Sequence, residues 1–191
     1  MSIAIITASA NDSTAENTVL ALTRVGLPSA LFAAVNASVE NLAVSTGYVL
    51  LTDQVTTPVI QLLTECAAIG KPIIGIGQGA KLLAITGLVP GLENNKPAIT
   101  LQPLSTASLL YLRLTSDYQR NAFTKHLSAQ TILKLSAQPP EHCFVMSPAL
   151  SMEMDYQGLN LLLYCDQAGE IQASHPTAAV CNKAGNILAI L

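Results

Sequence analysis

Charged side chains are scarce in this sequence: they make up 11% of its 191 residues, well below the roughly one quarter that is usual for soluble domains. The formal net charge is −3, and no long run of like charges occurs. The chain therefore lacks the basic surface expected of a protein that binds nucleic acid or an anionic membrane. Because half of the residues are hydrophobic, we expect part of the surface to be covered by another protein, either a different chain or a second copy of this one.

Long apolar runs are absent as well. Segments such as Tyr48–Leu51 have the length of a strand and fall far short of the roughly 18 residues that indicate a membrane-spanning helix. The segment Met1–Ile6 contains no basic residue, so it predicts a first strand rather than a signal peptide. We therefore expect a cytoplasmic protein.

The cysteines show no CxxC spacing, which argues against a zinc site or a disulfide framework. They are Cys66, Cys143, Cys165 and Cys181. Buried thiols in a reducing compartment are the simpler interpretation. The histidines are scattered along the chain at positions 126, 142 and 175, and we expect neither a metal site nor a cofactor.

Strand and helix signals alternate over the first 90 residues. Strands are predicted at Ile3–Thr7, Ser29–Ala33, Gly47–Leu51 and Pro72–Ile76. Ser13 and Glu16 have the capping-box spacing of a helix start, and Gly26 is placed to end that helix. Thr57-Pro58 begins a second helix. This alternation predicts an α/β fold, with a parallel sheet joined by right-handed crossovers.

The pattern becomes rich in β-strand signals after Pro90-Gly91. Extended segments are predicted at Ala98–Leu101, Leu109–Thr115, Thr131–Leu135, Leu161–Cys165, Ala178–Cys181 and Asn186–Leu191. A short helix is predicted near Tyr118–His126. No repeat or low-complexity linker separates the two halves, so the sequence predicts a single domain over residues 1–191.

One stretch around residue 77 predicts a sharp turn from strand to helix. The sequence reads IIGIGQGAKLLAITG from Ile73 to Gly87. Gly75 and Gly79 lie two residues before and two after Gly77, as in a nucleophile elbow, where backbones approach closely. The central residue of an elbow is the nucleophile, yet here it is Gly77. We expect Gly77 to adopt backbone angles that would strain any other residue.

Two ordered segments carry a resemblance to a known family. The family is the class I glutamine amidotransferase subunit of phosphoribosylformylglycinamidine synthase. Its segment GKPVLGICNGFQIL resembles Gly70–Gly79 and the residues that follow, and its segment AGLLPG resembles Gly87–Gly91. Tyr164–Asp166 and Val180–Leu188 resemble that family's YxD turn and AGICNxxGNVLG hairpin. The resemblance implies a flavodoxin-like α/β fold, with a parallel sheet, flanking helices and a β-rich second half.

The catalytic residues of the family have no counterparts in this sequence. The family's nucleophilic Cys corresponds to Gly77, between Gly75 and Gln78-Gly79. The glycine-rich loop that supplies oxyanion donors corresponds to Thr52-Asp53-Gln54, which is shorter and contains no glycine. The family's His and Glu would follow the strand Asn186–Leu191, where this sequence ends.

The resemblance therefore implies a pseudoenzyme with a degenerate elbow, a degenerate oxyanion loop and no catalytic residue. We expect a non-catalytic binding or structural partner of a synthetase like phosphoribosylformylglycinamidine synthase, in purine biosynthesis.

Other interpretations of the same residues stay open. The chain could be an enzyme or small-molecule binder that uses other residues of the scaffold. Gly75, Gly77 and Ala80 also match G-x-G-x-x-A, a form of the dinucleotide-binding fingerprint. That fingerprint normally follows the first strand of a βαβ unit, whereas this segment follows a later strand. The glycines could also serve only to make a tight turn.

Overall fold

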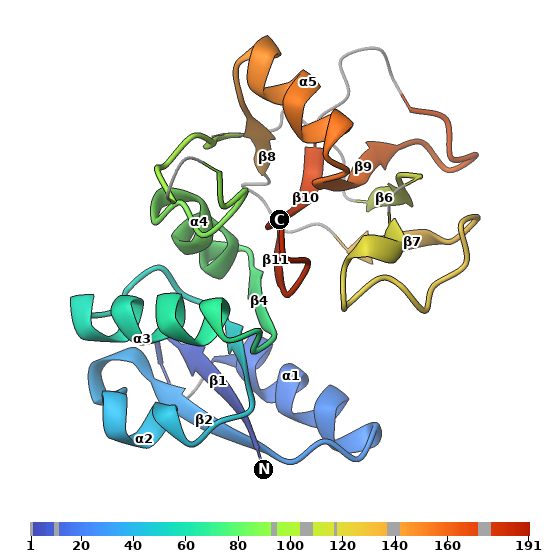
Figure 1. Ribbon diagram of the computed structural model, residues 1–191. Helices are drawn as coiled ribbons and strands as arrows, with labels where there is room; N and C mark the ends of the chain where they lie inside the picture. Colours follow the sequence, from blue (N-terminus) through green and yellow to red (C-terminus); the bar gives the residue numbers. More distant parts are fainter. Residues whose placement is uncertain are drawn as a thin grey trace.

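The computed structural model describes residues 2–9, 12–92, 95–103, 109–116, 118–136, 142–171 and 177–191. Its strands form one mixed sheet that runs through both halves of the sequence, with helices packed against it (Figure 1). In this part of the chain the sheet has 11 strands. No helix in these residues is long and apolar enough to cross a membrane.

Five parallel strands form one half of the sheet, in the order β2-β1-β3-β4-β11. Their bounds are β1 Ile3–Thr7, β2 Ser29–Ala33, β3 Gly47–Leu50, β4 Ile73–Ile76 and β11 Ile187–Ile190. This is the strand order of flavodoxin-like folds. The parallel sheet expected from the alternating first half is confirmed, and the last strand of the chain completes it.

Antiparallel strands extend the sheet beyond β11, in the order β10-β9-β6-β7. Their bounds are β6 Leu109–Leu114, β7 Ile132–Ser136, β9 Asn160–Cys165 and β10 Thr177–Cys181. A further pair, β5 Thr100–Pro103 and β8 His142–Val145, joins the sheet through β10. The β-rich second half expected from the sequence is therefore confirmed.

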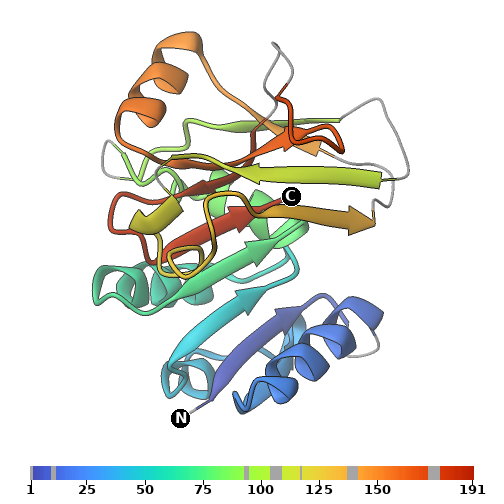
Figure 2. The same cartoon turned by 90° about the vertical axis from the view of Figure 1, so that its right-hand side faces the viewer.

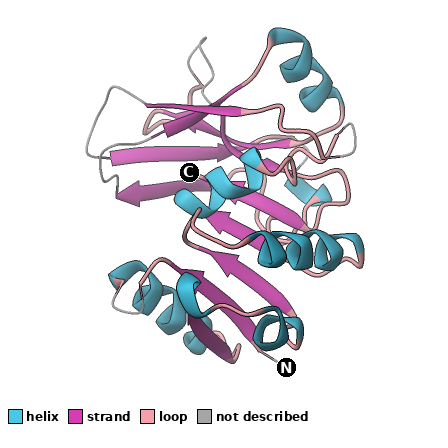
Figure 3. Ribbon diagram, turned by 90° about the vertical axis from the view of Figure 1, so that its left-hand side faces the viewer, coloured by secondary structure: helices cyan, strands magenta, loops and turns pink. Residues whose placement is uncertain are grey.

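The helices of the parallel half lie on both faces of its strands. α1 (Ser13–Arg24) packs against β1 and β2 on one face. α2 (Val39–Ala43), α3 (Thr57–Ala68) and α4 (Gln78–Ile85) cover the other face and lie in front of the strands in Figure 3. Tyr48 marks this second face, because its hydroxyl donates to the Leu42 carbonyl (3.0 Å) and lies 3.2 Å from Cys66 Sγ.

Three elements of the second half differ from the sequence-based expectation. Strand β8 (His142–Val145) and helix α5 (Pro148–Tyr156) were not expected. Met154 is the only buried side chain of α5, so the sequence shows almost no apolar stripe there. The helix expected near Tyr118–His126 is only a short 3₁₀ turn, η2, at Tyr118–Arg120. The first half contains a similar turn, η1, at Ala34–Asn36.

The turn between β10 and β11 is fastened to the end of α3 by buried amides. Asn186 Nδ2 donates to the carbonyls of Ala67 and Lys71, both at 2.9 Å. Asn182 Oδ1 accepts from the backbone N–H groups of Asn186 (3.1 Å) and Ile187 (3.0 Å). These bonds hold the last parallel strand in place beside β4.

Replacing Asn186 with Ala removes both donors to the carbonyls of Ala67 and Lys71. Because the Lys71 carbonyl loses its amide donor and the Ala67 carbonyl keeps the Gly70 N–H (3.0 Å), we expect Asn186→Ala to lower the free energy of unfolding by about 2–3 kcal/mol. Urea unfolding followed by circular dichroism measures this. The exposed Asn41 on α2 is the control, and Asn41→Ala is expected to change stability by less than about 0.5 kcal/mol. Equal effects of the two substitutions would contradict the fastening role.

Candidate functional site

The strand-to-helix turn expected at Gly77 is present. β4 ends at Ile76, Gly77 has φ 57° and ψ −111°, and α4 begins at Gln78. These angles lie outside the regions that residues with a side chain readily adopt, so the backbone conformation expected at Gly77 is confirmed. The Gly77 N–H donates to the Ile190 carbonyl at 2.9 Å, which holds the turn against the end of β11.

The three glycines of the turn do not all stand at their positions for the same physical reason. A Cβ on Gly75 would overlap the backbone of Gly79, and a Cβ on Gly79 would overlap the carbonyl of Leu50. A Cβ on Gly77 would meet nothing within 4 Å. Gly75 and Gly79 are therefore required for close packing, whereas at Gly77 a side chain has room and only the backbone angles oppose it.

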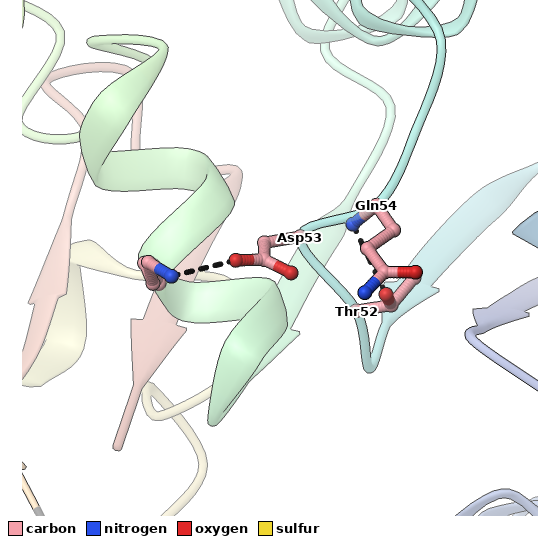
Figure 4. A network of polar contacts seen from close by, with 4 residues as sticks. Thr52, Asp53 and Gln54 are labelled. Atoms are coloured by element: carbon pink, nitrogen blue, oxygen red, sulfur yellow. Dashed lines mark hydrogen bonds and ion pairs between the residues drawn. The ribbon is translucent and has the colours of Figure 1, made fainter.

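The loop after β3 lies beside α4 and is tied to it. Asp53 Oδ2 accepts from Lys81 Nζ at 2.7 Å, as the dashed line in Figure 4 shows. The Thr52 hydroxyl oxygen accepts from the Gln54 N–H at 3.1 Å. Thr52 is buried, whereas Gln54 is exposed. The structure thus brings the loop Thr52-Asp53-Gln54 close to the first turns of α4.

Lys81 is a site residue that the sequence-based interpretation missed. It is the only charged residue between Ile73 and Gly87, and this single charge in an apolar stretch is the feature of the sequence that could have pointed to it. Its side chain is 43% exposed and that of Asp53 is 24% exposed. An ion pair this accessible to solvent contributes about 0–1 kcal/mol, so its main effect is to position the loop.

The end of β1 reaches the same edge of the sheet, but its polar residues cap a helix. Asp12 accepts from the Thr14 N–H and from the Thr7 hydroxyl, both at 2.9 Å. Burial alone would raise the pKa of Asp12, but these hydrogen bonds together lower it below its ordinary value. Asp12 is thus held as a carboxylate at the N-terminus of α1.

No cysteine lies at the turn around Gly77. Cys66 is buried on α3 beside Tyr48, and Cys143, Cys165 and Cys181 lie on β8, β9 and β10. Burial raises the pKa of Cys143 and of Cys165, where the charge of Asp166 adds to the effect. Burial also raises the pKa of Cys181 to about 11. These three groups are therefore poor thiolate nucleophiles at neutral pH.

The described residues contain no cluster of three or more His, Cys, Asp or Glu side chains that could hold a metal ion. His126 lies in the segment after η2 and His142 begins β8, so the structure does not bring these two together at the turn. His175 lies outside the described residues.

Comparison with known proteins was made by sequence and by structure. No family model matches the chain. It is 28% identical over 130 residues to the phosphoribosylformylglycinamidine synthase subunit PurQ of Aquifex aeolicus, which covers 68% of this chain and 55% of the relative. The PurQ subunit of Methanocaldococcus jannaschii is 25% identical over 130 residues, covering 68% and 54%. The matches thus span about half the length of these curated relatives.

Solved structures resemble the chain over its whole length. A structure of PurLQS from Thermotoga maritima has a TM-score of 0.65 at 13% identity and covers 100% of this chain and 86% of its own. A glutamine amidotransferase from the same organism has a TM-score of 0.60 at 12% identity and covers 100% and 74%. The chain has the class I glutamine amidotransferase fold. The family resemblance inferred from the sequence is confirmed at this level.

A ThuA-like protein from Bacteroides uniformis has a TM-score of 0.61 at 11% identity and covers 99% of this chain and 80% of its own. Identities this low show the fold alone, and the class I glutamine amidotransferase fold does not by itself establish an activity.

Packing requires glycine at position 79, whereas only the backbone angles favour it at position 77. Replacing each of them with Ala is therefore predicted to lower the free energy of unfolding by a different amount. Gly77→Ala incurs only backbone strain, about 1–2 kcal/mol of unfolding free energy. Gly79→Ala forces α4 away from the Leu50 carbonyl, and we expect a loss of about 3 kcal/mol or more. Urea unfolding of both variants checks this order. If the Gly77→Ala protein were the less stable of the two, the close contact between Gly79 and the Leu50 carbonyl would be contradicted.

The raised thiol pKa values predict slow modification of the folded protein. A raised pKa leaves less thiolate at a given pH, so at pH 8 we expect Cys143, Cys165 and Cys181 together to react about tenfold or more slowly than in the unfolded chain. Reaction with an aromatic disulfide reagent, with and without guanidinium, measures this. Raising the pH from 8 to 10 speeds the folded-state reaction. A thiol among these three that reacts as fast folded as unfolded would contradict the burial.

Proposed function

We propose that this chain is a catalytically inactive glutamine amidotransferase-like protein, retained as a non-catalytic binding partner of a synthetase that resembles phosphoribosylformylglycinamidine synthase. The observation that carries the proposal is Gly77. It lies where an elbow holds its nucleophile, with backbone angles that would strain a residue bearing a side chain and with no atom within 4 Å of where its Cβ would be. The frame of the elbow is present, and the position of the reacting atom has no side chain.

The loop Thr52-Asp53-Gln54 supports inactivity independently. An oxyanion hole needs N–H groups that are free to donate to the substrate. Here the Gln54 N–H already donates to the Thr52 hydroxyl, and Asp53 is paired with Lys81. We therefore assign this loop as a degenerate oxyanion loop.

The proposed partner follows from the relatives and from the surface. The sequence relatives are synthase subunits, and the solved PurLQS structure is named for an assembly. Several aliphatic side chains of this chain are more than two-thirds exposed. They are Val25, Val35, Val44 and Ile69. Together with the scarcity of charged residues, these side chains leave apolar surface for another chain to cover. Because the sequence relatives are synthase subunits, we propose that the protein acts in purine biosynthesis as a binding subunit.

The proposal predicts no glutamine hydrolysis, either by the chain alone or with the synthetase subunit present. Without a nucleophile, the binding and polar groups that remain give only a small rate over water. Release of glutamate and ammonia from glutamine is the measurement, with heat-denatured protein as the control. Turnover above that control that persists through repurification would overturn the proposal.

A thiol placed at the turn tests whether the nucleophile alone is missing. We expect Gly77→Cys to fold, because a Cβ there meets no neighbour, and to remain without glutaminase activity. One thiol does not supply a general base or free oxyanion donors. Labelling by a glutamine-analogue electrophile is measured beside turnover. Glutaminase activity in this variant would show that the loop after β3 still works as an oxyanion hole.

A further inference from the structure

Strand β2 is an open edge of the sheet. Among the described residues it pairs with β1 alone, and it is the outermost strand of the parallel half in Figure 1. α1 contacts one face of β2, and Figure 2 shows α1 alongside β1 at this end of the sheet. All 5 residues of β2 are partly exposed. The outer edge of this strand is therefore accessible to another chain.

The outer edge of β2 presents unpaired backbone groups. The Pro28 carbonyl, just before the strand, accepts from the Ile3 N–H of β1 at 2.9 Å. Backbone groups alternate between the two sides of a strand, so the even-numbered residues of β2 bond to β1, and Ser29, Leu31 and Ala33 are directed outward. In the described part of the chain, no hydrogen bond reaches the N–H groups of Leu31 and Ala33 or the carbonyls of Ser29 and Leu31. Such groups form a template for another strand.

The other open edges of the sheet carry residues that oppose strand pairing, and β2 does not. Charged side chains and Pro are the usual means of blocking an edge. Over the described residues, β7 has the exposed Lys134 at its centre and β5 ends at Pro103. No charged residue occurs from Val25 to Val39, the segment that contains β2. Pro28 precedes β2, but its nitrogen lies on the β1 side and leaves the outer edge unblocked.

We propose that two copies of this chain associate through β2, paired antiparallel across a two-fold axis at Leu31, so that their sheets become continuous. At a two-fold axis each side chain near the axis meets its own copy, and a charge there would face a like charge. Pairing of two β7 edges would place Lys134 against itself, whereas pairing of two β2 edges brings no charges together. The inference rests neither on the synthetase partner nor on the loss of glutaminase activity.

A register centred on Leu31 satisfies the outward groups of both copies. The Leu31 N–H and carbonyl bond to the carbonyl and N–H of Leu31 in the second copy, and the Ala33 N–H donates to the Ser29 carbonyl of the second copy. The same register brings Val35 of one copy to the end of the strand where Leu27 of the other lies. These two side chains are 85% and 44% exposed, so the association removes apolar surface from water.

The charges on the helices that flank β2 also suit an antiparallel pair. α1 has Glu16 in its first turn and Arg24 in its last. α2 has Glu40 in its first turn, and Lys71 Nζ donates to the Ser45 carbonyl just beyond its end, at 2.7 Å. Both helices return the chain to the start of the next parallel strand, so both run against the strand direction. Reversing one copy against the other brings the acidic starts of these helices towards the basic ends of their counterparts.

A pair of proline substitutions tests the proposal. Ala33 has φ −68°, an angle that Pro adopts, and its N–H is directed outward. Ala33→Pro therefore removes a donor to the second copy and no bond to β1. Thr56 is the control, because it is exposed, lies before α3 with φ −77°, and its N–H donates to none of the described residues. Circular dichroism of both variants checks that they fold.

Light scattering over a range of concentrations measures the association. We expect the native protein to reach about twice the 20.0 kDa mass of one chain. Ala33→Pro should raise the dissociation constant of the dimer by about tenfold or more, and Thr56→Pro should change it by less than about twofold. A native protein that stays monomeric at every concentration would overturn the proposal, and so would equal effects of the two prolines.

Amide hydrogen exchange of the native protein locates the contact without any substitution. As the concentration rises, exchange of the Leu31 and Ala33 N–H groups should slow by about tenfold or more, whereas the N–H groups of Ala30 and Phe32, already bonded to β1, should keep their protection. A dimer without added protection at Leu31 would overturn the proposal in favour of another surface. Glutamine hydrolysis by a protein that dimerises through β2 would overturn only the proposed inactivity.

Discussion

The backbone contact between α4 and the end of β3 is the constraint on which the candidate site depends. At Gly79 the helix lies so close to the Leu50 carbonyl that no Cβ fits between them. That contact fixes where α4 begins and forces the chain to turn sharply at Gly77, where φ is positive. It also brings Lys81, in the first turns of α4, within 2.7 Å of Asp53. The turn, the helix start and the loop after β3 are thus consequences of one close approach.

The backbone frame of the elbow and the chemistry of an elbow depend on different residues. Gly75 and Gly79 are needed because backbones meet there, so the frame persists for reasons of packing alone. Packing does not require glycine at position 77, since a Cβ there would meet nothing within 4 Å. A glycine at the centre of the turn relieves the strain that an enzyme accepts in order to present its nucleophile. Under the proposed function, a chain without catalysis gains stability from glycine at this position and keeps its fold.

Much of the fold could be predicted from the sequence, because the relevant signals are local. The capping residues and Pro58 mark the helices of the first half, and the apolar runs mark its buried strands. Helix α5 was missed because only Met154 is buried on it, although Ser147 and Pro148 supplied a start signal. The position of β11 beside β4 depends on contacts between distant segments, such as Asn186 with Ala67 and Lys71, and the sequence did not predict it. The Asp53–Lys81 pair also joins distant segments, and spacing in the sequence does not reveal it.

The central claim is that the chain is retained to bind a synthetase rather than to hydrolyse glutamine. Sedimentation velocity of the purified chain mixed with the phosphoribosylformylglycinamidine synthetase subunit of the same organism tests it most directly. The account predicts a single faster boundary that contains both proteins in a fixed ratio, with or without glutamine. Two independent boundaries at every ratio tested would contradict it.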